Sequence, residues 1–236
     1  MTSLSDPARR NAPPDAAIFD MDGVLIDSNP FHLRIWREFL TQQGVAFDPA
    51  RLGAQIFGQR DDKALRMFFG AGLSDEQSAR WSEDLERTFR ETFGPHAQAL
   101  PGAAELIREC HARGIPMAVA SSAMKKNVDF VVEALGLRPY FGAIVSGDEV
   151  SRPKPDPEIY LAAARDLGAQ PSRSVAFEDS PIGIEAVVRA GMKCVAIAST
   201  FAIEDLRSQT RADAVVRSFE ELNVGRLQAL FEQQNF

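Results

Sequence analysis

The stretch Ala16-Ala17-Ile18-Phe19-Asp20-Met21-Asp22-Gly23 decides the fold. Its first four residues are apolar and give way at once to a polar turn, a pattern typical of a buried strand that ends at a charged loop. Asp20 and Asp22 are two positions apart, so in an extended backbone their carboxylates point to the same face. Two carboxylates on one face suit acid/base chemistry or a hard metal ion with oxygen ligands.

The same alternation of apolar segments and helical patterns continues along the chain. Further short apolar segments cover 115–120, 143–145, 174–177, 194–198 and 214–216, and the first three end in polar side chains. Helical patterns that stop at a glycine cover 103–113, 127–135, 157–167 and 182–190, and a last helix is expected over 224–236. Strand and helix in alternation predict an α/β fold with a doubly wound parallel sheet. Ligands of such sheets bind beyond the carboxyl ends of the strands.

One part of the chain contains helical patterns only. Between residues 30 and 98 the apolar spacing indicates helices over 31–43, 61–69 and 75–93, and no convincing strand. This segment is too long for a loop, so we expect a helical subdomain that covers the site. The predicted organisation is therefore a flexible tail at 1–15, a core formed by 16–29 and 99–236, and an inserted α-helical cap domain at 30–98.

Composition excludes several classes of protein. The net charge is −7 and the pI is near 5.1, which argues against a nucleic-acid or anionic membrane surface as the main partner. No apolar run reaches the roughly 18 residues of a membrane span, and the polar N-terminus lacks the apolar region of a secretory signal. Cys110 and Cys194 are the only cysteines and are expected to be reduced thiols. We therefore expect a cytoplasmic monomer that acts on a small molecule.

Four motifs in order give the chain a specific resemblance. The stretch from Asp20 to Ser28 resembles the first motif of the haloacid dehalogenase superfamily of aspartyl-phosphate enzymes. Ser121 after an apolar segment, Lys154 between prolines, and Glu178-Asp179-Ser180 match the remaining motifs in order. The resemblance is closest to the branch that contains β-phosphoglucomutase and small sugar phosphatases, whose helical cap lies between the first two motifs. It implies a Rossmann-like core.

The resemblance implies a role for each catalytic motif residue. Asp20 would attack phosphorus and form an aspartyl-phosphate. Asp22 would protonate the leaving oxygen and then take a proton from water. Lys154 would place a positive charge against the phosphoryl oxygens, and Ser121 would donate a hydrogen bond to them.

The resemblance also implies a Mg²⁺ cofactor. Its ligands would be Asp20, the main-chain carbonyl of Asp22, and the carboxylates of Asp179 and Glu178, an oxygen-rich set that suits the ion. Whether Glu178 binds the metal directly is left open by the sequence.

Candidate substrate-binding residues lie in the cap and in the second motif. His32 matches a histidine of the branch at the cap entry, while Arg60 and Lys63 are cations that would meet an anionic group. Further candidates after the second motif are Ser122, Lys126 and Asn127. Where β-phosphoglucomutases have Arg and Ser in the cap loop, this chain has Asp61 and Ala64, which lowers the case for a mutase.

These observations predict a Mg²⁺-dependent phosphatase acting on a small phosphorylated metabolite such as a sugar phosphate. The alternative is a phosphomutase of the β-phosphoglucomutase type, which returns the phosphoryl group to the bound intermediate. A non-catalytic phosphate-binding protein is disfavoured because all the catalytic motif residues are present. Sequence patterns for a P-loop, a dinucleotide-binding loop, a nucleophile elbow and an HExxH zinc site are absent.

Overall fold

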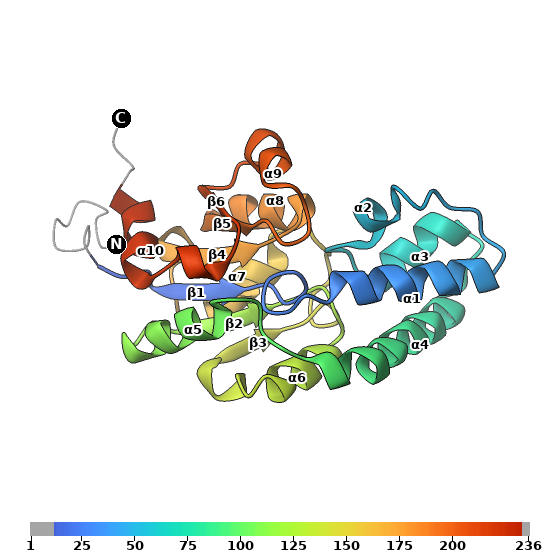
Figure 1. The fold of residues 1–236 in the computed structure, drawn as a ribbon, viewed down its shortest axis with the longest axis horizontal. Helices are drawn as coiled ribbons and strands as arrows, with labels where there is room; N and C mark the ends of the chain where they lie inside the picture. The colour runs from blue at the N-terminus through green and yellow to red at the C-terminus, as the bar shows by residue number, and fades with distance from the viewer. Residues whose placement is uncertain (1–11, 233–236) are drawn as a thin grey trace.

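The computed structural model describes residues 12–232, and its centre is a six-stranded parallel sheet (Figure 1). The strand order is β3-β2-β1-β4-β5-β6. The strands are β1 (Ala16–Phe19), β2 (Met117–Ala120), β3 (Ala143–Val145), β4 (Ser174–Glu178), β5 (Lys193–Ile197) and β6 (Ala214–Val216). The predicted fold class, a doubly wound parallel sheet with an inserted helical cap, is confirmed.

Strand β1 lies in the middle of the sheet, between β2 and β4. Ala17 pairs with Met117 on one side and with Val175 on the other. Along the chain, β2 and β3 are added on one side of β1, and β4, β5 and β6 are then added on the other side. Ligand sites of open parallel sheets lie at such a reversal point, which here is the carboxyl end of β1.

Helices cover both faces of the sheet because successive strand residues point to opposite sides. Phe19 packs in a core with residues of α5, α6 and α10, whereas Ile18 packs in a second core with residues of α7, α8 and α9. The helix bounds are α5 (Ala103–Ala112), α6 (Lys125–Ala134), α7 (Glu158–Asp166), α8 (Pro181–Arg189), α9 (Ile203–Gln209) and α10 (Val224–Glu232). Short 3₁₀ turns are η3 (Arg138–Tyr140), η4 (Pro171–Arg173) and η5 (Phe219–Glu221).

The helical insertion lies beyond the carboxyl end of β1 (Figure 1). It consists of α1 (Asn29–Gln42), α2 (Leu52–Ile56), α3 (Asp61–Phe69), α4 (Asp75–Phe93) and the turn η2 (Gly94–His96). Aromatic contacts hold these helices together, among them Phe39 against Trp81 and Phe69 against Trp81. The domain boundaries at 30 and 98 remain our proposal.

The two connections between core and cap run side by side. Leu100 donates its backbone N–H to the carbonyl of Leu25 at 2.8 Å, and Ile26 and Ala99 form an antiparallel bridge. The chain therefore leaves the core and returns to it at one place.

Element boundaries differ from the sequence expectation by one or two residues at several ends, and the short helices α2 and α9 were not predicted. The expected helix over 224–236 ends at Glu232 in the described part, and 233–236 lie outside it. Residues 1–11 of the predicted tail also lie outside the described residues, whereas Arg173 donates to the carbonyls of Ala12 and Pro13. Among residues 12–232, no helix is long and apolar enough to cross a membrane.

Candidate active site

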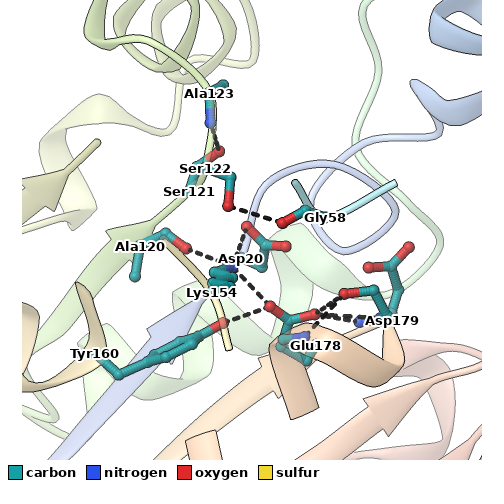
Figure 2. A network of polar contacts seen from close by, with 12 residues as sticks. Asp20, Gly58, Ala120, Ser121, Ser122, Ala123, Lys154, Tyr160, Glu178 and Asp179 are labelled. Atoms are coloured by element: carbon teal, nitrogen blue, oxygen red, sulfur yellow. Dashed lines mark hydrogen bonds and ion pairs between the residues drawn. The ribbon is translucent and has the colours of Figure 1, made fainter. Parts of the chain in front are cut away.

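Three buried carboxylates meet at the carboxyl end of the sheet (Figure 2). Asp20 follows β1, Glu178 is the last residue of β4, and Asp179 follows it; one ligand oxygen from each lies within 4.8 Å of the others. The register explains the meeting, because Phe19 pairs with Phe177 and the next residues therefore lie side by side.

Lys154 is the cation of this cluster. Its Nζ lies 3.2 Å from Oδ1 of Asp20 and 2.7 Å from Oε1 of Glu178, and its side chain is 1% exposed. Figure 2 shows the ammonium between the carbonyl of Ala120 and these two carboxylates. Burial alone would lower the pKa of Lys154, but the two carboxylates outweigh it and raise that pKa above its usual value. The ammonium therefore stays charged beside Asp20.

The carboxylate of Glu178 is fully engaged in hydrogen bonds. Oε1 accepts from Lys154 and, at 2.6 Å, from the hydroxyl of Tyr160. Oε2 accepts from the backbone N–H of Asp179 and from both the N–H and the hydroxyl of Ser180. Helix α8 approaches so closely that a Cβ on Gly183 would lie 1.9 Å from Oε1. These bonds favour a role for Glu178 in holding Lys154 over a role as a metal ligand.

Asp179 is held by two side chains that the sequence analysis did not select. Asn29 donates from Nδ2 to Oδ2 of Asp179 at 3.1 Å, and the hydroxyl of Thr200 donates to the same oxygen. Thr200 lies shortly after the carboxyl end of β5. The expectation that polar residues beyond strand ends line the site, which selected Asp20 and Asp179, would therefore also have selected Thr200. Gly23 has a φ of 72°, and a Cβ there would lie 2.0 Å from Oδ2 of Asp179.

The donor set fits a hard divalent cation. All the candidate ligand atoms are oxygens, which suits Mg²⁺. Burial, together with the neighbouring carboxylate of Glu178, raises the pKa of Asp179 to about 8. Burial also raises the pKa of Asp20 well above its usual value, against the opposing effect of Lys154. Burial is the main cause of both shifts and the neighbouring carboxylates add to it, and a bound cation would lower both pKa values.

Asp22 faces the cap entry, where it pairs with His32. Its Oδ1 accepts from the hydroxyl of Ser28 at 2.5 Å and lies 3.3 Å from Nε2 of His32. The His32 ring is stacked on Phe89 with ring centroids 4.3 Å apart. Burial would raise the pKa of Asp22, but the bonds from His32 and Ser28 outweigh it and lower that pKa. Conversely, Asp22 raises the pKa of His32 against the effect of burial.

Ser121 of the second motif and the three predicted residues that follow it contact different parts of the site. The hydroxyl of Ser121 is buried beside the cluster and accepts from the N–H of Ala123 at 3.1 Å. The other three predicted residues contact the cap instead. Ser122 donates to the carbonyl of Gly58, Lys126 to Glu83, and Asn127 to Glu86.

Arg60 and Lys63, the cap cations expected to meet an anion, do not reach the carboxylate cluster. Arg60 makes two bonds of 2.9 Å to Asp62 and donates to the core carbonyls of Gly147 and Val150 at 3.1 and 3.3 Å. Lys63 is exposed. The structure thus joins Arg60 to the core rather than presenting a free guanidinium.

A family model of haloacid dehalogenase-like hydrolases matches residues 14–191. The chain belongs to this family.

Individual relatives agree with the family match. A phosphorylated carbohydrates phosphatase of Thermotoga maritima is 30% identical over 89% of this chain and 97% of that protein. The chloroplastic 5-amino-6-(5-phospho-D-ribitylamino)uracil phosphatase of Arabidopsis thaliana is 31% identical over 88% of this chain, which spans only 55% of that protein. The crystal structure of β-phosphoglucomutase from Clostridium difficile is 25% identical, with a TM-score of 0.82 over 93% of this chain and 98% of that one. The suspected β-phosphoglucomutase-like branch is confirmed.

A small cavity of about 40 Å³ separates the carboxylate cluster of this haloacid dehalogenase-like chain from its cap. Asp20, Asp22 and Ser122 line it from the core side, and His32, Asp61 and Glu86 from the cap side, together with apolar residues such as Trp36. Glu86 was not among the residues selected from the sequence. Its side chain belongs to the polar face of an amphipathic helix, and the sequence does not show which polar positions of such a face meet the core.

Proposed function

We propose that this haloacid dehalogenase-like chain is a Mg²⁺-dependent phosphatase that hydrolyses a small phosphorylated metabolite through an aspartyl-phosphate on Asp20. The observation that carries the proposal is the position of Asp20, between the ammonium of Lys154 at 3.2 Å and the carboxylate of Asp179 at the carboxyl end of β1. Similarity to the phosphorylated carbohydrates phosphatase of Thermotoga maritima supports a sugar phosphate as substrate.

The carboxylates of Asp20 and Asp179 and the main-chain carbonyl of Asp22 would hold the metal. Bound Mg²⁺ supplies positive charge that offsets the repulsion between a carboxylate and a phosphate, about 4 kcal/mol per pair of unit charges at 4 Å and an effective dielectric constant near 20. Asn29 and Thr200 orient the carboxylate of Asp179 for this task.

In the first half-reaction a carboxylate oxygen of Asp20 attacks phosphorus. Lys154 binds the phosphoryl oxygens, and the hydroxyl of Ser121, which accepts one bond and still has a proton to donate, binds them as well. The bond from phosphorus to the ester oxygen breaks, and Asp22 gives that oxygen its proton. The hydrogen bond to His32 keeps Asp22 oriented toward the leaving group.

In the second half-reaction water attacks the phosphorus of the aspartyl-phosphate. Asp22, now ionised, takes the proton from this water, and the carboxylate of Asp20 is regenerated as inorganic phosphate forms. The lowered pKa of Asp22, maintained by His32 and Ser28, favours the ionised state that this step requires and opposes the protonated state of the first half-reaction.

The test is the Asp20→Asn variant, which keeps the shape of the side chain and removes the attacking oxygen charge. Phosphate release from p-nitrophenyl phosphate with Mg²⁺ should fall by at least about a thousandfold in kcat. Asp27→Asn is the matched control, because Asp27 is exposed in the same stretch of chain and should keep full activity. Retention of a tenth of the wild-type kcat in Asp20→Asn would contradict the proposal.

The mutase alternative is supported by the likeness to β-phosphoglucomutase of Clostridium difficile. A mutase must bind a second phosphate in the cap while excluding water. The cap side of the small cavity offers Asp61 and Glu86, which repel a second phosphate. With β-glucose 1-phosphate, Mg²⁺ and a bisphosphate primer, we expect free phosphate as the main product. Accumulation of glucose 6-phosphate ahead of phosphate would establish the mutase.

A further inference from the structure

A second, larger cavity extends the candidate active site between the cap and the core. Its volume is about 520 Å³, and it shares Asp61, Glu86 and Ser122 with the small cavity over the carboxylate cluster. Ligand pockets of roughly 300–1,000 Å³ are typical of small-molecule sites. The shared residues make the larger cavity the space into which a phosphate ester would extend from Asp20.

Two buried hydroxyls in this cavity have nothing to bind. Ser78 and Ser82 lie on α4 at steps of four residues before Glu86, so the three side chains share one helix face. They are 2% and 6% exposed, and both line the larger cavity. Neither hydroxyl has a hydrogen-bond partner among residues 12–232. Buried polar groups without a partner are uncommon and call for an explanation, which a ligand with polar groups would provide.

The charges along the cavity are unbalanced. Its three cations are already paired, Arg60 with Asp62, Arg66 with Asp75 and Lys126 with Glu83. Asp61 and Glu86 form no ion pair within the described part of the chain. Their carboxyl groups are hydrogen-bonded to each other, and Asn127 donates its amide to Glu86. Burial raises the pKa of Asp61 to about 6, against the opposing effects of Glu86 and His32. Burial and the neighbouring Asp61 raise the pKa of Glu86, against the opposing effect of Arg90. Glu86 is buried and Asp61 is half-buried, and no ion pair compensates either carboxylate. Such a pair is an arrangement that a cationic ligand group stabilises.

We propose that the substrate is an amino-sugar or amino-polyol monophosphate, whose ammonium group lies against Asp61 and Glu86 and whose hydroxyls bond to Ser78 and Ser82. This inference rests on the proposed phosphatase function and specifies its substrate class. Because Asp61 and Glu86 line the same small cavity as Asp20, the amine belongs a few bonds from the ester. A second phosphate at the far end is rejected, since no unpaired cation of the described residues lines either cavity.

The first experiment compares substrates that differ only at the amine. Initial rates with Mg²⁺ are measured for glucosamine 6-phosphate and glucose 6-phosphate, and for the corresponding 1-phosphates. We expect kcat/KM to favour the amine by at least tenfold in one of the two pairs. N-acetylation of glucosamine 6-phosphate removes the charge and should abolish the preference. If kcat/KM for the amino-sugar phosphate is equal to or below that for the neutral sugar phosphate in both pairs, the inference is overturned.

The second experiment removes the acidic charge from the cavity. Glu86→Gln should reduce the preference for the amino-sugar phosphate at least fivefold. The variant should change kcat/KM for the neutral sugar phosphate less than it changes kcat/KM for the amino-sugar phosphate. Glu91→Gln, on the exposed side of the same helix, is the matched control and should leave the ratio unchanged. Asp61→Asn gives an independent measurement if Glu86→Gln does not fold. An unchanged ratio in every folded variant of this acidic pair contradicts the assignment.

The hydroxyls are tested separately. Ser82→Ala should raise KM for the amine and the neutral sugar phosphate by the same factor, with kcat preserved, because each would lose the same bond. An unchanged KM for both would contradict a role for Ser82 in binding.

The experiments distinguish a failure of the proposed phosphatase function from a failure of the proposed substrate class. If p-nitrophenyl phosphate and glucose 6-phosphate are hydrolysed without any preference for an amine, the phosphatase function stands and the substrate class is overturned. If no phosphate ester is hydrolysed with Mg²⁺, both are overturned.

Discussion

Glu178 and Asp179 are neighbours in the chain, yet their hydrogen bonds give them different tasks. Glu178 accepts bonds from Lys154, Tyr160 and Ser180. Asp179 is bonded to Asn29 and Thr200, and a carboxylate held by two side chains still has lone pairs for a metal. At the scale of single residues, we therefore propose different tasks for the two carboxylates: Glu178 positions the Lys154 ammonium, and Asp179 would bind the metal.

Substitution of each carboxylate by its amide distinguishes these tasks. Glu178→Gln should lower kcat by about 10- to 100-fold, a typical range for residues that orient a site. The Mg²⁺ concentration for half-maximal activity should stay within twofold. Asp179→Asn should raise that concentration at least about tenfold. Activity is titrated against Mg²⁺ for both variants, and a large rise in the Mg²⁺ requirement of Glu178→Gln would identify Glu178 as a ligand.

The thiol of Cys110 gives a second prediction at this scale. Burial raises the pKa of Cys110 to about 12, and burial also raises the pKa of Cys194 well above its usual value. Below these pKa values the thiols stay protonated, and the thiolate is the reactive form. At pH 8 the folded protein should therefore show almost no reaction with a disulfide reagent, whereas both thiols should react in urea. Rapid reaction of the folded protein would contradict the burial of these side chains.

Among the elements, α4 combines two functions on different faces. Leu85, Phe89 and Phe93 pack into the core of the cap, while Ser78 and Ser82 face the larger cavity. Ser74 is the N-cap of the helix and accepts from the N–H of Gln77 at 3.1 Å. The stability of α4 can therefore be changed at its end without changing the cavity.

Ser74→Ala should lower the free energy of unfolding by about 1 kcal/mol, the usual effect of losing an N-cap hydroxyl. Urea denaturation measures this loss. The values of kcat and KM should be unchanged at a temperature well below the unfolding transition, because Ser74 lines neither cavity. A drop in kcat with unchanged stability would contradict this separation.

The sequence predicts elements well where a period is long enough to be recognised. Helices α3 and α4 have the expected bounds because their apolar spacing repeats over several turns. Helix α2 has only five residues, so its pattern cannot be distinguished from a loop. The carboxylate cluster could be predicted because strand order places the ends of β1 and β4 together. The hydrogen-bond partners of Arg60 could not be predicted, because Gly147 is 87 positions away and the contact depends on the orientation of the cap relative to the core.

At the scale of the whole molecule, Arg60 and Ser122 join the cap to the core. Arg60 donates to the carbonyls of Gly147 and Val150, and Ser122 donates to that of Gly58. These bonds hold the cap over the carboxylate cluster, where exclusion of water strengthens electrostatic interactions.

Arg60→Ala should therefore impair every substrate to a similar extent. A hydrogen bond to a charged group contributes about 1.5–3 kcal/mol, so kcat/KM should fall about tenfold or more for both p-nitrophenyl phosphate and glucose 6-phosphate. Lys63→Ala, which removes an exposed cation in the first turn of α3, the helix that Arg60 precedes, serves as the control and should have little effect. A loss confined to substrates with a distal anion would instead show that Arg60 contacts the substrate.

The paired connections at Leu25–Leu100 and Ile26–Ala99 have a consequence for the modularity of the protein. Because the chain leaves and re-enters the core at neighbouring positions, an insert of any length can be accommodated there if its own ends lie close together. The cap can thus be exchanged as one unit while the sheet, with Asp20 and Lys154, stays intact. A lineage that inherits this core can acquire new substrates by replacing one continuous segment of its gene.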